Sequence, residues 1–303
     1  MKYAINMTVN KMSRDGSILG KVSDFQEELK LHEEAGLNNY KKHPHVSACD
    51  RVSRVYNRHT GKTEEVIIFG SNSYLGATIL TEAVERAIEV TKEFGIGSGG
   101  VPLLTGTTIY QSQLERIIAG KTGFRDAILF SSGYTANLGV ISGLLRSNHL
   151  IIHDKLNHAS LLDATVLSGA RMLRFRHGDM VHLEKILSEN AEQYPNGIMV
   201  ATDGVFSMDG DIAKIPDMYT LCKKYNAILL IDEAHATGVI GEKGAGTLSY
   251  YGITERDNII VTGTLSKAVG AVGGYITASQ EIIDYLRIYA RSNMFSTSLP
   301  PSV

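Results

Sequence analysis

The sequence predicts an α/β fold in which a mostly parallel central sheet is flanked by helices. Short apolar segments alternate with amphipathic helical segments along most of the chain, which is the pattern of parallel strands joined by helical crossovers. The predicted strands are apolar on both faces, as expected when helices cover both sides of a sheet. Because ligands bind beyond the carboxyl ends of strands in such sheets, the polar residues after each strand are candidates for a site.

The N-terminal part of the chain has a different pattern. Residues 24–36 have helical periodicity and end on Gly36, a common helix stop. Residues 37–63 are polar and basic, and we interpret them as an arm and a surface hairpin. We therefore expect two parts, an N-terminal helix and arm at residues 1–63 and a large domain at residues 64–303.

The large domain is expected to begin with a strand and then to alternate. A helix is predicted where apolar residues recur on one face, and a strand where a short apolar run is bounded by polar residues or glycine. The predicted strands are residues 64–70, 127–133, 150–154, 171–175, 197–204, 227–235, 258–264 and 270–279. The predicted helices are residues 81–95, 110–123, 134–145, 159–169, 180–193, 218–226 and 280–292.

Composition and charge exclude several classes of protein. With 30 basic and 32 acidic residues the net charge is −2, so no basic excess points to nucleic acid or an anionic membrane. Cys49 and Cys222 lie too far apart for a metal site or redox pair, and Cys222 falls at a buried helical position. The N-terminus lacks the apolar core of a secretory signal, and the longest apolar runs are too short to cross a bilayer. We expect a cytoplasmic enzyme without a transmembrane segment or a nucleic-acid partner.

A candidate phosphate site follows the predicted strand that ends near Phe130. Ser131, Ser132, Gly133 and Tyr134 open a helix there. Free backbone amides and the helix dipole at such a position favour a phosphate group. Taken alone, this segment is better explained as an ordinary strand-to-helix turn that contains a glycine.

Other chemically active residues follow the remaining strands. They are His158, then Asp203 and Ser207, then Asp232 and His235, and finally Lys267. Each residue has an ordinary structural explanation. A lone histidine near a helix start is more often a cap or a core residue. An acid followed three residues later by a histidine fits either a metal pair or an acid that caps the next turn.

Together these residues match what pyridoxal 5'-phosphate (PLP) needs. Lys267 lies in the stretch GTLSKAVGAVGG, where small residues and Ser266 leave room for a cofactor. Burial there would lower the pKa of the lysine, and a neutral amine can attack the PLP aldehyde to form a Schiff base. A carboxylate must keep the pyridine nitrogen protonated, a flat side chain should stack on the ring, and a helix N-terminus should hold the phosphate.

The chain resembles the α-oxoamine synthases, a branch of the fold-type I PLP enzymes. This family includes 8-amino-7-oxononanoate synthase, 2-amino-3-ketobutyrate CoA ligase, 5-aminolevulinate synthase and serine palmitoyltransferase. The resemblance runs from about residue 70 to the end of the chain. It rests on SNSYLG, LLTGTT, LFSSGYTAN, NHASLLDA, RFRHGD, DGVFSMDGDIA, IDEAHATGVIGEKGAG, GTLSKAVGAVGG and FSTSLPP, which occur in family order. It implies that residues 64–303 form the PLP-binding large domain of the aspartate aminotransferase-like fold.

The resemblance also implies roles for individual residues. The expected catalytic residues are Lys267 as the Schiff-base lysine, Asp232 at the pyridine nitrogen, His235 at the phenolic oxygen and His158 on the ring face. The expected cofactor-binding residues further include Ser132, Gly133, Tyr134, Ser207 and Thr264, with Ser296 and Thr297 reaching the phosphate of a neighbouring subunit. Asn72 lies where the family contacts substrate, and no metal is expected.

The implied reaction is the decarboxylative condensation of an amino acid with an acyl thioester of CoA or an acyl carrier protein, giving an α-oxoamine. The implied assembly is a homodimer with active sites at the interface, and the small C-terminal domain of the family is expected to be absent from this sequence. Three motifs, TLSKAVGAVGG, RFRHGD and STSLPPSV, lean towards the serine palmitoyltransferase branch.

Two departures from the family pattern concern the acyl donor. Val101–Pro102 replace the usual Ser-Arg, and no histidine occurs around Gln111. They leave the acyl donor undefined, both in its chain length and in whether it is a CoA ester.

Two alternative functions stay open. One is another fold-type I reaction, a transamination or a Cα–Cβ lyase step, in which Lys267 and Asp232 would serve equally well. The other is a non-catalytic partner subunit.

Overall fold

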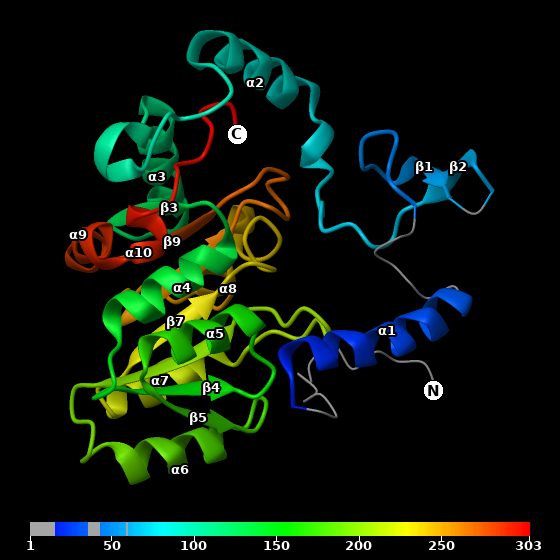
Figure 1. Cartoon of the computed structure of the whole chain (residues 1–303). Helices are drawn as coiled ribbons and strands as arrows, with labels where there is room; N and C mark the ends of the chain where they lie inside the picture. Colours follow the sequence, from blue (N-terminus) through cyan, green and yellow to red (C-terminus); the bar gives the residue numbers. More distant parts are fainter. Residues whose placement is uncertain (1–15, 36–42, 59) are drawn as a thin grey trace. The chain divides into compact units, whose positions relative to one another are not determined.

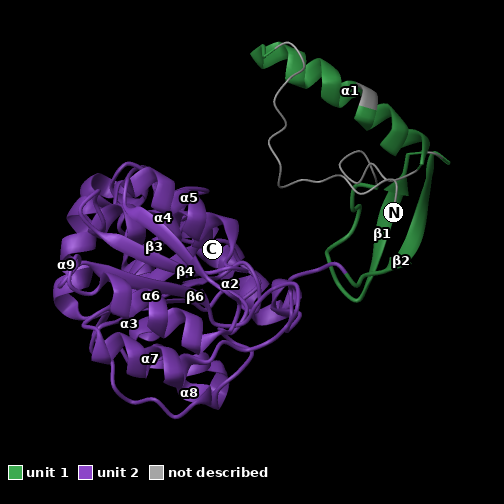
Figure 2. Ribbon diagram, turned by 90° about the horizontal axis from the view of Figure 1, so that it is seen from below, with its two compact units in different colours: residues 1–69 green, residues 70–303 purple. Residues whose placement is uncertain are grey.

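The computed structural model describes residues 16–35, 43–58 and 60–303. The chain forms two compact units, Met1–Phe69 and Gly70–Val303 (Figure 2). In the part that the structure describes, no helix combines the length and the apolar character needed to cross a membrane.

The first unit contains a helix and an antiparallel hairpin. Its elements are α1 (Ile18–Glu34), β1 (Val52–Asn57) and β2 (Lys62–Ile67). The expected hairpin therefore forms, but it extends to Ile67. The strand predicted at residues 64–70 is the second strand of this hairpin and does not belong to the central sheet.

The helix α1 begins earlier than the periodicity predicted. Ser17 precedes its first turn, and the Ser17 Oγ accepts a hydrogen bond from the Gly20 amide at 2.8 Å. Serine is a preferred residue at this position because it satisfies an amide that the helix leaves unpaired. The cap sets the start of the helix at Ile18, whereas the periodicity became visible only from Asp24. Gly36, the predicted stop, and residues 37–42 lie outside the described residues.

The second unit is built on a seven-stranded sheet (Figure 1). The strand order is β3-β9-β8-β7-β6-β4-β5. The strands are β3 (Asp126–Phe130), β4 (Leu150–Asp154), β5 (Arg171–Phe175), β6 (Ile198–Asp203), β7 (Ile228–Asp232), β8 (Ile259–Thr264) and β9 (Gly274–Ala278). The strands β4 to β8 pair in parallel, whereas β9 lies antiparallel between β3 and β8.

The sheet is mostly parallel, as predicted, and β9 is its antiparallel strand. Residues 265–273 connect β8 to β9, and no helix lies between them. A parallel pair needs a crossover of a dozen or more residues, so this short connection returns the chain in the opposite direction. Because β3 and β8 are both antiparallel to β9, the other six strands all end at the same edge of the sheet.

Helices follow most of the strands, as predicted. The longer ones are α2 (Thr81–Phe94), α3 (Ile109–Thr122), α4 (Gly133–Leu144), α5 (Ala159–Ser168), α6 (Met180–Asn190), α7 (Ile215–Lys224) and α9 (Gln280–Tyr289). Short helices occur at η2 (Ala77–Ile79), η3 (Pro102–Gly106), η4 (Glu242–Gly244), α8 (Thr247–Tyr250) and α10 (Arg291–Met294). The single helix predicted at residues 280–292 is interrupted at Ala290, whose backbone has φ −77° and ψ 89°.

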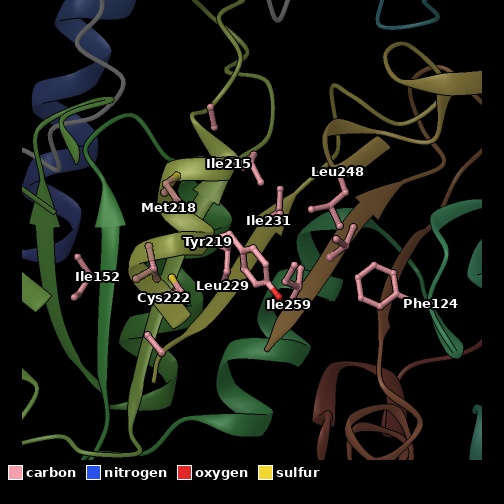
Figure 3. Close-up of a cluster of buried hydrophobic side chains, with 14 of the residues drawn as sticks. Phe124, Ile152, Ile215, Met218, Tyr219, Cys222, Leu229, Ile231, Leu248 and Ile259 are labelled. Atoms are coloured by element: carbon pink, nitrogen blue, oxygen red, sulfur yellow. The ribbon is translucent and has the colours of Figure 1, made fainter. Parts of the chain in front are cut away.

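The two faces of the sheet bury separate hydrophobic clusters. On β7, Leu229 and Ile231 point into one cluster and Leu230 points into the other, because successive side chains of a strand alternate. Residues of α3, α6 and α7 complete the first cluster, part of which is shown in Figure 3. Residues of α4, α5 and α9 complete the second. Cys222 is buried in α7, as predicted.

Candidate active site

Most of the predicted site residues line one cavity at the carboxyl ends of the strands. The cavity has a volume of about 220 Å³. It is lined by Ser132, Gly133, Tyr134, His158, Asp232, His235, Thr264 and Lys267. They come from the ends of β3, β4, β7 and β8, which lie at the same edge because these strands run in the same direction.

Four predicted residues do not line this cavity. Ser207 is exposed in the loop after β6, and Asn72 is exposed in the segment before η2. Ser296 and Thr297 line a second cavity of about 330 Å³, which α3, β3, α9 and the segment after α10 border. Within this unit, the structure therefore does not place these four side chains beside Lys267.

The two departures from the family pattern also lie at the second cavity. Pro102 starts the π-helical turn η3 and lines this cavity together with Gln111. The Gln111 Nε2 donates a hydrogen bond to the Leu299 carbonyl at 2.6 Å, and its Oε1 accepts one from the Thr108 amide at 2.5 Å. The Gln111 side chain thus joins the start of α3 to the segment after α10.

The N-terminus of α4 forms an open anion site. The Ser132 Oγ accepts a hydrogen bond from the Thr135 amide at 3.1 Å, and the Ser132 amide donates to Thr135 Oγ1 at 3.0 Å. This capping box leaves the Gly133 and Tyr134 amides without an acceptor among the described residues. Unpaired amides at a helix N-terminus attract anions. A side chain at Gly133 would be tight, because a Cβ atom would lie 3.0 Å from the Thr264 Cβ.

The backbone of β9 also lies close to the turn that starts α4. A Cβ atom on Gly274 would lie 2.2 Å from the Ser132 carbonyl oxygen and 2.5 Å from the Gly133 nitrogen. Both neighbours are backbone atoms that cannot move aside cheaply. Only glycine therefore allows β9 to pass beneath the start of α4. The Thr264 hydroxyl, also close by, donates to the Gly273 carbonyl at 2.9 Å.

Lys267 ends a chain of three polar side chains. The Lys267 Nζ lies 2.7 Å from His235 Nε2, and His235 Nδ1 lies 2.6 Å from the Tyr74 hydroxyl. Burial lowers the pKa of Lys267, and the charges of Asp232 and Asp203 oppose this shift. Burial, together with the charge of Lys267, also lowers the pKa of His235. The pocket thus shifts both bases towards their neutral forms, although two acids, Asp232 and Asp203, act on the lysine.

Two buried carboxyl groups face the lysine. Asp203 and Asp232 are paired across β6 and β7 and are 4% and 6% exposed. Burial and the neighbouring charge of Asp232 raise the pKa of Asp203 to about 8, so Asp203 is protonated at neutral pH. The Asp232 carboxylate accepts hydrogen bonds from the Asn137 Nδ2 at 2.7 Å and the Ala234 amide at 2.9 Å. Asp232 is thereby held in one orientation.

His158 presents an exposed ring to the cavity. Its Nδ1 lies 2.7 Å from the Ser160 Oγ and accepts a hydrogen bond from the Ser160 amide at 3.3 Å. The histidine is thus both the N-cap of α5 and a wall of the cavity. The cap that the sequence suggested is therefore present, and it does not prevent the ring from lining the cavity. Among the described residues, no group of three or more acids, histidines or cysteines could bind a metal ion.

Sequence reasoning missed several residues of this site. Asn137 and Ser160 line the cavity but lie inside predicted helices, where they read as ordinary helical positions. Tyr74 stands in the quoted motif SNSYLG, yet nothing in the sequence shows that it reaches His235, which is 161 residues away. Asp203 was named among the residues that follow the strands, but no role was predicted for it, although it lines the same cavity.

Comparison with known proteins identifies a family model and similar enzymes. A model of the aminotransferase class I and II family matches residues 64–303. The chain is 46% identical over 242 residues to 8-amino-7-oxononanoate synthase from Geotalea daltonii, a match that covers 79% of this chain and 60% of that protein. The chain spans about 60% of the length of the curated relatives that it matches.

Solved structures of serine palmitoyltransferases are also similar. The enzyme from Sphingomonas wittichii superimposes with a TM-score of 0.86 at 33% sequence identity, covering 95% of this chain and 70% of that one. A variant of the S. paucimobilis enzyme with bound PLP–myriocin superimposes with a TM-score of 0.85 at 32% identity and the same coverage. With the fold, the site and the relatives in agreement, the chain belongs to the class I and II aminotransferase family, in its α-oxoamine synthase branch.

Proposed function

We propose that this chain carries the PLP-binding large domain of an acyltransferase that condenses an amino acid with an acyl thioester, with loss of carbon dioxide. The observation that carries this proposal is the shared cavity of Lys267, Asp232 and the open N-terminus of α4. The similarity to 8-amino-7-oxononanoate synthase and serine palmitoyltransferase supports the class of reaction. The amino acid and the acyl donor are not assigned.

The residues of the cavity fit the parts of PLP. The Gly133 and Tyr134 amides would bind the phosphate, and the exposed ring of His158 would lie against the pyridine ring. The fixed carboxylate of Asp232 would hold the proton of the pyridine nitrogen. The Lys267 amine would take the aldehyde. When bound, PLP supplies an aldehyde for the lysine and a ring that accepts electrons from the substrate.

The side chains around Lys267 prepare it to react. An amine must be neutral to act as a nucleophile, and burial lowers the pKa of Lys267 in that direction. His235 Nε2 lies 2.7 Å from the Lys267 Nζ, and the lowered pKa of His235 leaves its ring neutral beside the amine. Tyr74 holds the other nitrogen of His235 at 2.6 Å and so fixes the orientation of its ring.

Chemical trapping tests the cofactor assignment. The purified chain should bind added PLP and gain an absorption band that borohydride removes. Peptide mapping of the reduced protein should find the pyridoxyl group on Lys267. Lys267→Ala should lose this attachment while keeping the fold, because Lys267 is only partly buried and does not belong to either hydrophobic cluster. A pyridoxyl group on a different lysine would show that the site is misassigned.

A substrate panel separates acyl transfer from other PLP chemistry. The protein is assayed with amino acids and acyl thioesters of CoA and carrier protein, and thiol release is recorded. Thiol release that depends on the amino acid supports the condensation. An oxo acid formed from the amino acid without thiol release would instead show transamination, and PLP attachment without any turnover would favour a non-catalytic subunit.

We also propose that the protein works as a homodimer whose cofactor site is completed across the interface. Ser296 and Thr297 do not line the cavity of Lys267 within this unit, which is consistent with their reaching a neighbouring subunit. Replacing both with alanine should weaken PLP retention most at low protein concentration, where dimers dissociate. If PLP retention is independent of concentration, the hydroxyls serve only this chain. The cytoplasmic location stays a prediction.

A further inference from the structure

A chain of buried hydrogen bonds joins His158 to Asp232. It runs through two polar side chains, Ser160 and Asn137, which are 0% and 2% exposed. The Asn137 Nδ2 lies 2.8 Å from the Ser160 Oγ and 2.7 Å from the Asp232 Oδ2. The Asn137 Oδ1 accepts a hydrogen bond from the Thr262 hydroxyl at 2.7 Å. Every hydrogen-bonding atom of the Asn137 side chain is therefore engaged.

The positions of the protons in this chain follow from its chemistry. A carboxylate can only accept, so the group of Asn137 that faces Asp232 must be the NH₂. The second N–H of that group points to the Ser160 Oγ, which therefore accepts from Asn137. The single proton of the Ser160 hydroxyl is then free to donate, and its other partner is His158 Nδ1 at 2.7 Å. The Ser160 amide donates to the same nitrogen at 3.3 Å.

His158 Nδ1 thus receives two donors and must carry a lone pair. The proton of the neutral ring is left on Nε2, which has no partner among the described residues and belongs to a ring exposed at the cavity. We propose that Asn137 and Ser160 are positioning residues that hold His158 in the Nε2–H tautomer and tie that tautomer to the carboxylate of Asp232. This rests on the proposed function only in taking His158 as a wall of the cofactor site.

The arrangement has a consequence for the site. The ring that would lie against PLP offers the cavity one N–H donor, and it cannot offer a lone pair at the same position. It can exchange this tautomer only by breaking the bonds at Nδ1, because a proton on Nδ1 would meet the two donors of Ser160. The same amide group of Asn137 that orients Asp232 also fixes the direction of the Ser160 hydroxyl, so the two cofactor contacts are set together.

The tautomer can be measured directly in the chain without PLP. The protein is labelled with ¹⁵N-histidine, and two-bond ¹H–¹⁵N correlation spectra are recorded above neutral pH, where the two neutral tautomers give different patterns. The chain has 10 histidines, and the signal that disappears in His158→Asn identifies His158. We expect an unprotonated Nδ1 and a protonated Nε2. A His158 signal of the Nδ1–H type would overturn the proposal.

Two variants test the path through Ser160 and Asn137. Ser160→Ala removes the hydroxyl that donates to the ring, and Asn137→Leu removes the amide without touching His158. The ratio of the two tautomers should shift about fivefold towards Nδ1–H in Ser160→Ala, which corresponds to the loss of about one neutral hydrogen bond. In Asn137→Leu it should shift in the same direction, because the Ser160 hydroxyl is no longer held towards the ring. A shift in Asn137→Leu is the signature of coupling, since that residue lies one hydrogen bond further away.

A matched control comes from the same helix. Thr165→Val removes a buried hydroxyl of α5 that bonds to His153 Nε2 at 2.8 Å, and it should leave the tautomer of His158 unchanged. An unchanged ratio in Ser160→Ala, or an equal change in the control, would refute the positioning role. If Asn137→Leu does not fold, the tautomer of the wild type and its change in Ser160→Ala still test whether His158 is held in the Nε2–H form. Failure to find PLP on Lys267 would refute the proposed function and leave this result standing.

Discussion

Replacing Asp203 with asparagine should change how the stability of the protein depends on pH. The Asp203 side chain is 4% exposed and pairs in register with Asp232, and one of its oxygens accepts a hydrogen bond from the His158 amide at 3.2 Å. Burial, followed by the charge of Asp232, raises the pKa of Asp203 from 3.8 to about 8. An asparagine side chain at this position would keep the shape of the protonated acid but would not titrate.

The sign and size of the effect follow from proton linkage. Between pH 4 and 8 the folded protein keeps a proton on Asp203 that the unfolded chain has released. The folded state binds more protons, so the free energy of unfolding falls as the pH rises through this window, by about 1.4 kcal/mol per pH unit. Between pH 5 and pH 7 the free energy of unfolding of the wild type should therefore fall by about 3 kcal/mol because of Asp203. Asp203→Asn should not show this loss.

Equilibrium unfolding in urea measures this difference. The wild type and Asp203→Asn are compared without PLP at pH 5 and pH 7, with Asp209→Asn as a control, because Asp209 is an exposed acid in the loop that follows β6. Glu233, whose pKa burial raises to about 7, titrates equally in all three proteins and cancels in the comparison. If the pH dependence of Asp203→Asn equals that of the wild type, the buried acid is not protonated and the reasoning is refuted.

Three further predictions concern other parts of the molecule. Gly274→Ala should destabilise the fold by about 1–3 kcal/mol and lower PLP affinity, because its Cβ would overlap the Ser132 carbonyl; urea unfolding and PLP titration measure both. Burial opposes the charged form of His177, but hydrogen bonds to Asp154 and Asp211 outweigh it and raise its pKa. His177→Gln should thus lose stability mainly below pH 6.5, and an equal loss at pH 9 would contradict this. Asp232→Asn should slow proton exchange at the substrate Cα by about 3–4 kcal/mol of lost charge stabilisation, while Lys267 still takes PLP.

The layered fold could be predicted because its signals are local. The helices α6, α7 and α9 repeat apolar residues on one face, and most strands are short apolar runs. The parallel arrangement then brings together residues that are far apart in the chain, which is why His158, Asp232 and Lys267 could be named together. The direction of β9 depends on the length of a loop rather than on a period, so the sequence pattern did not specify it.

The contacts between side chains could not be predicted in the same way. Asn137 lies in the second turn of α4, and its sequence context does not differ from that of a surface amide. Its role depends on the packing of α4 against β7, β8 and α5, which brings Asp232, Thr262 and Ser160 within hydrogen-bond distance. Tyr74 has the same limitation, since its contact with His235 crosses 161 residues of the chain. Such contacts are set by tertiary structure and leave no periodic signal.

The charges around the cavity affect how readily the Lys267 amine becomes neutral. Were Asp203 and Asp232 both ionised, their charges would favour the ammonium form of Lys267, which cannot attack an aldehyde. Burial keeps a proton on Asp203 at neutral pH, and the charge that raises the pKa of Lys267 is then that of the Asp232 carboxylate. Asn137 holds that carboxylate in place, and a bound pyridinium ring would neutralise it. The lysine would then face no net negative charge, its pKa would fall further, and PLP binding would itself prepare the amine for the bond that it has to form.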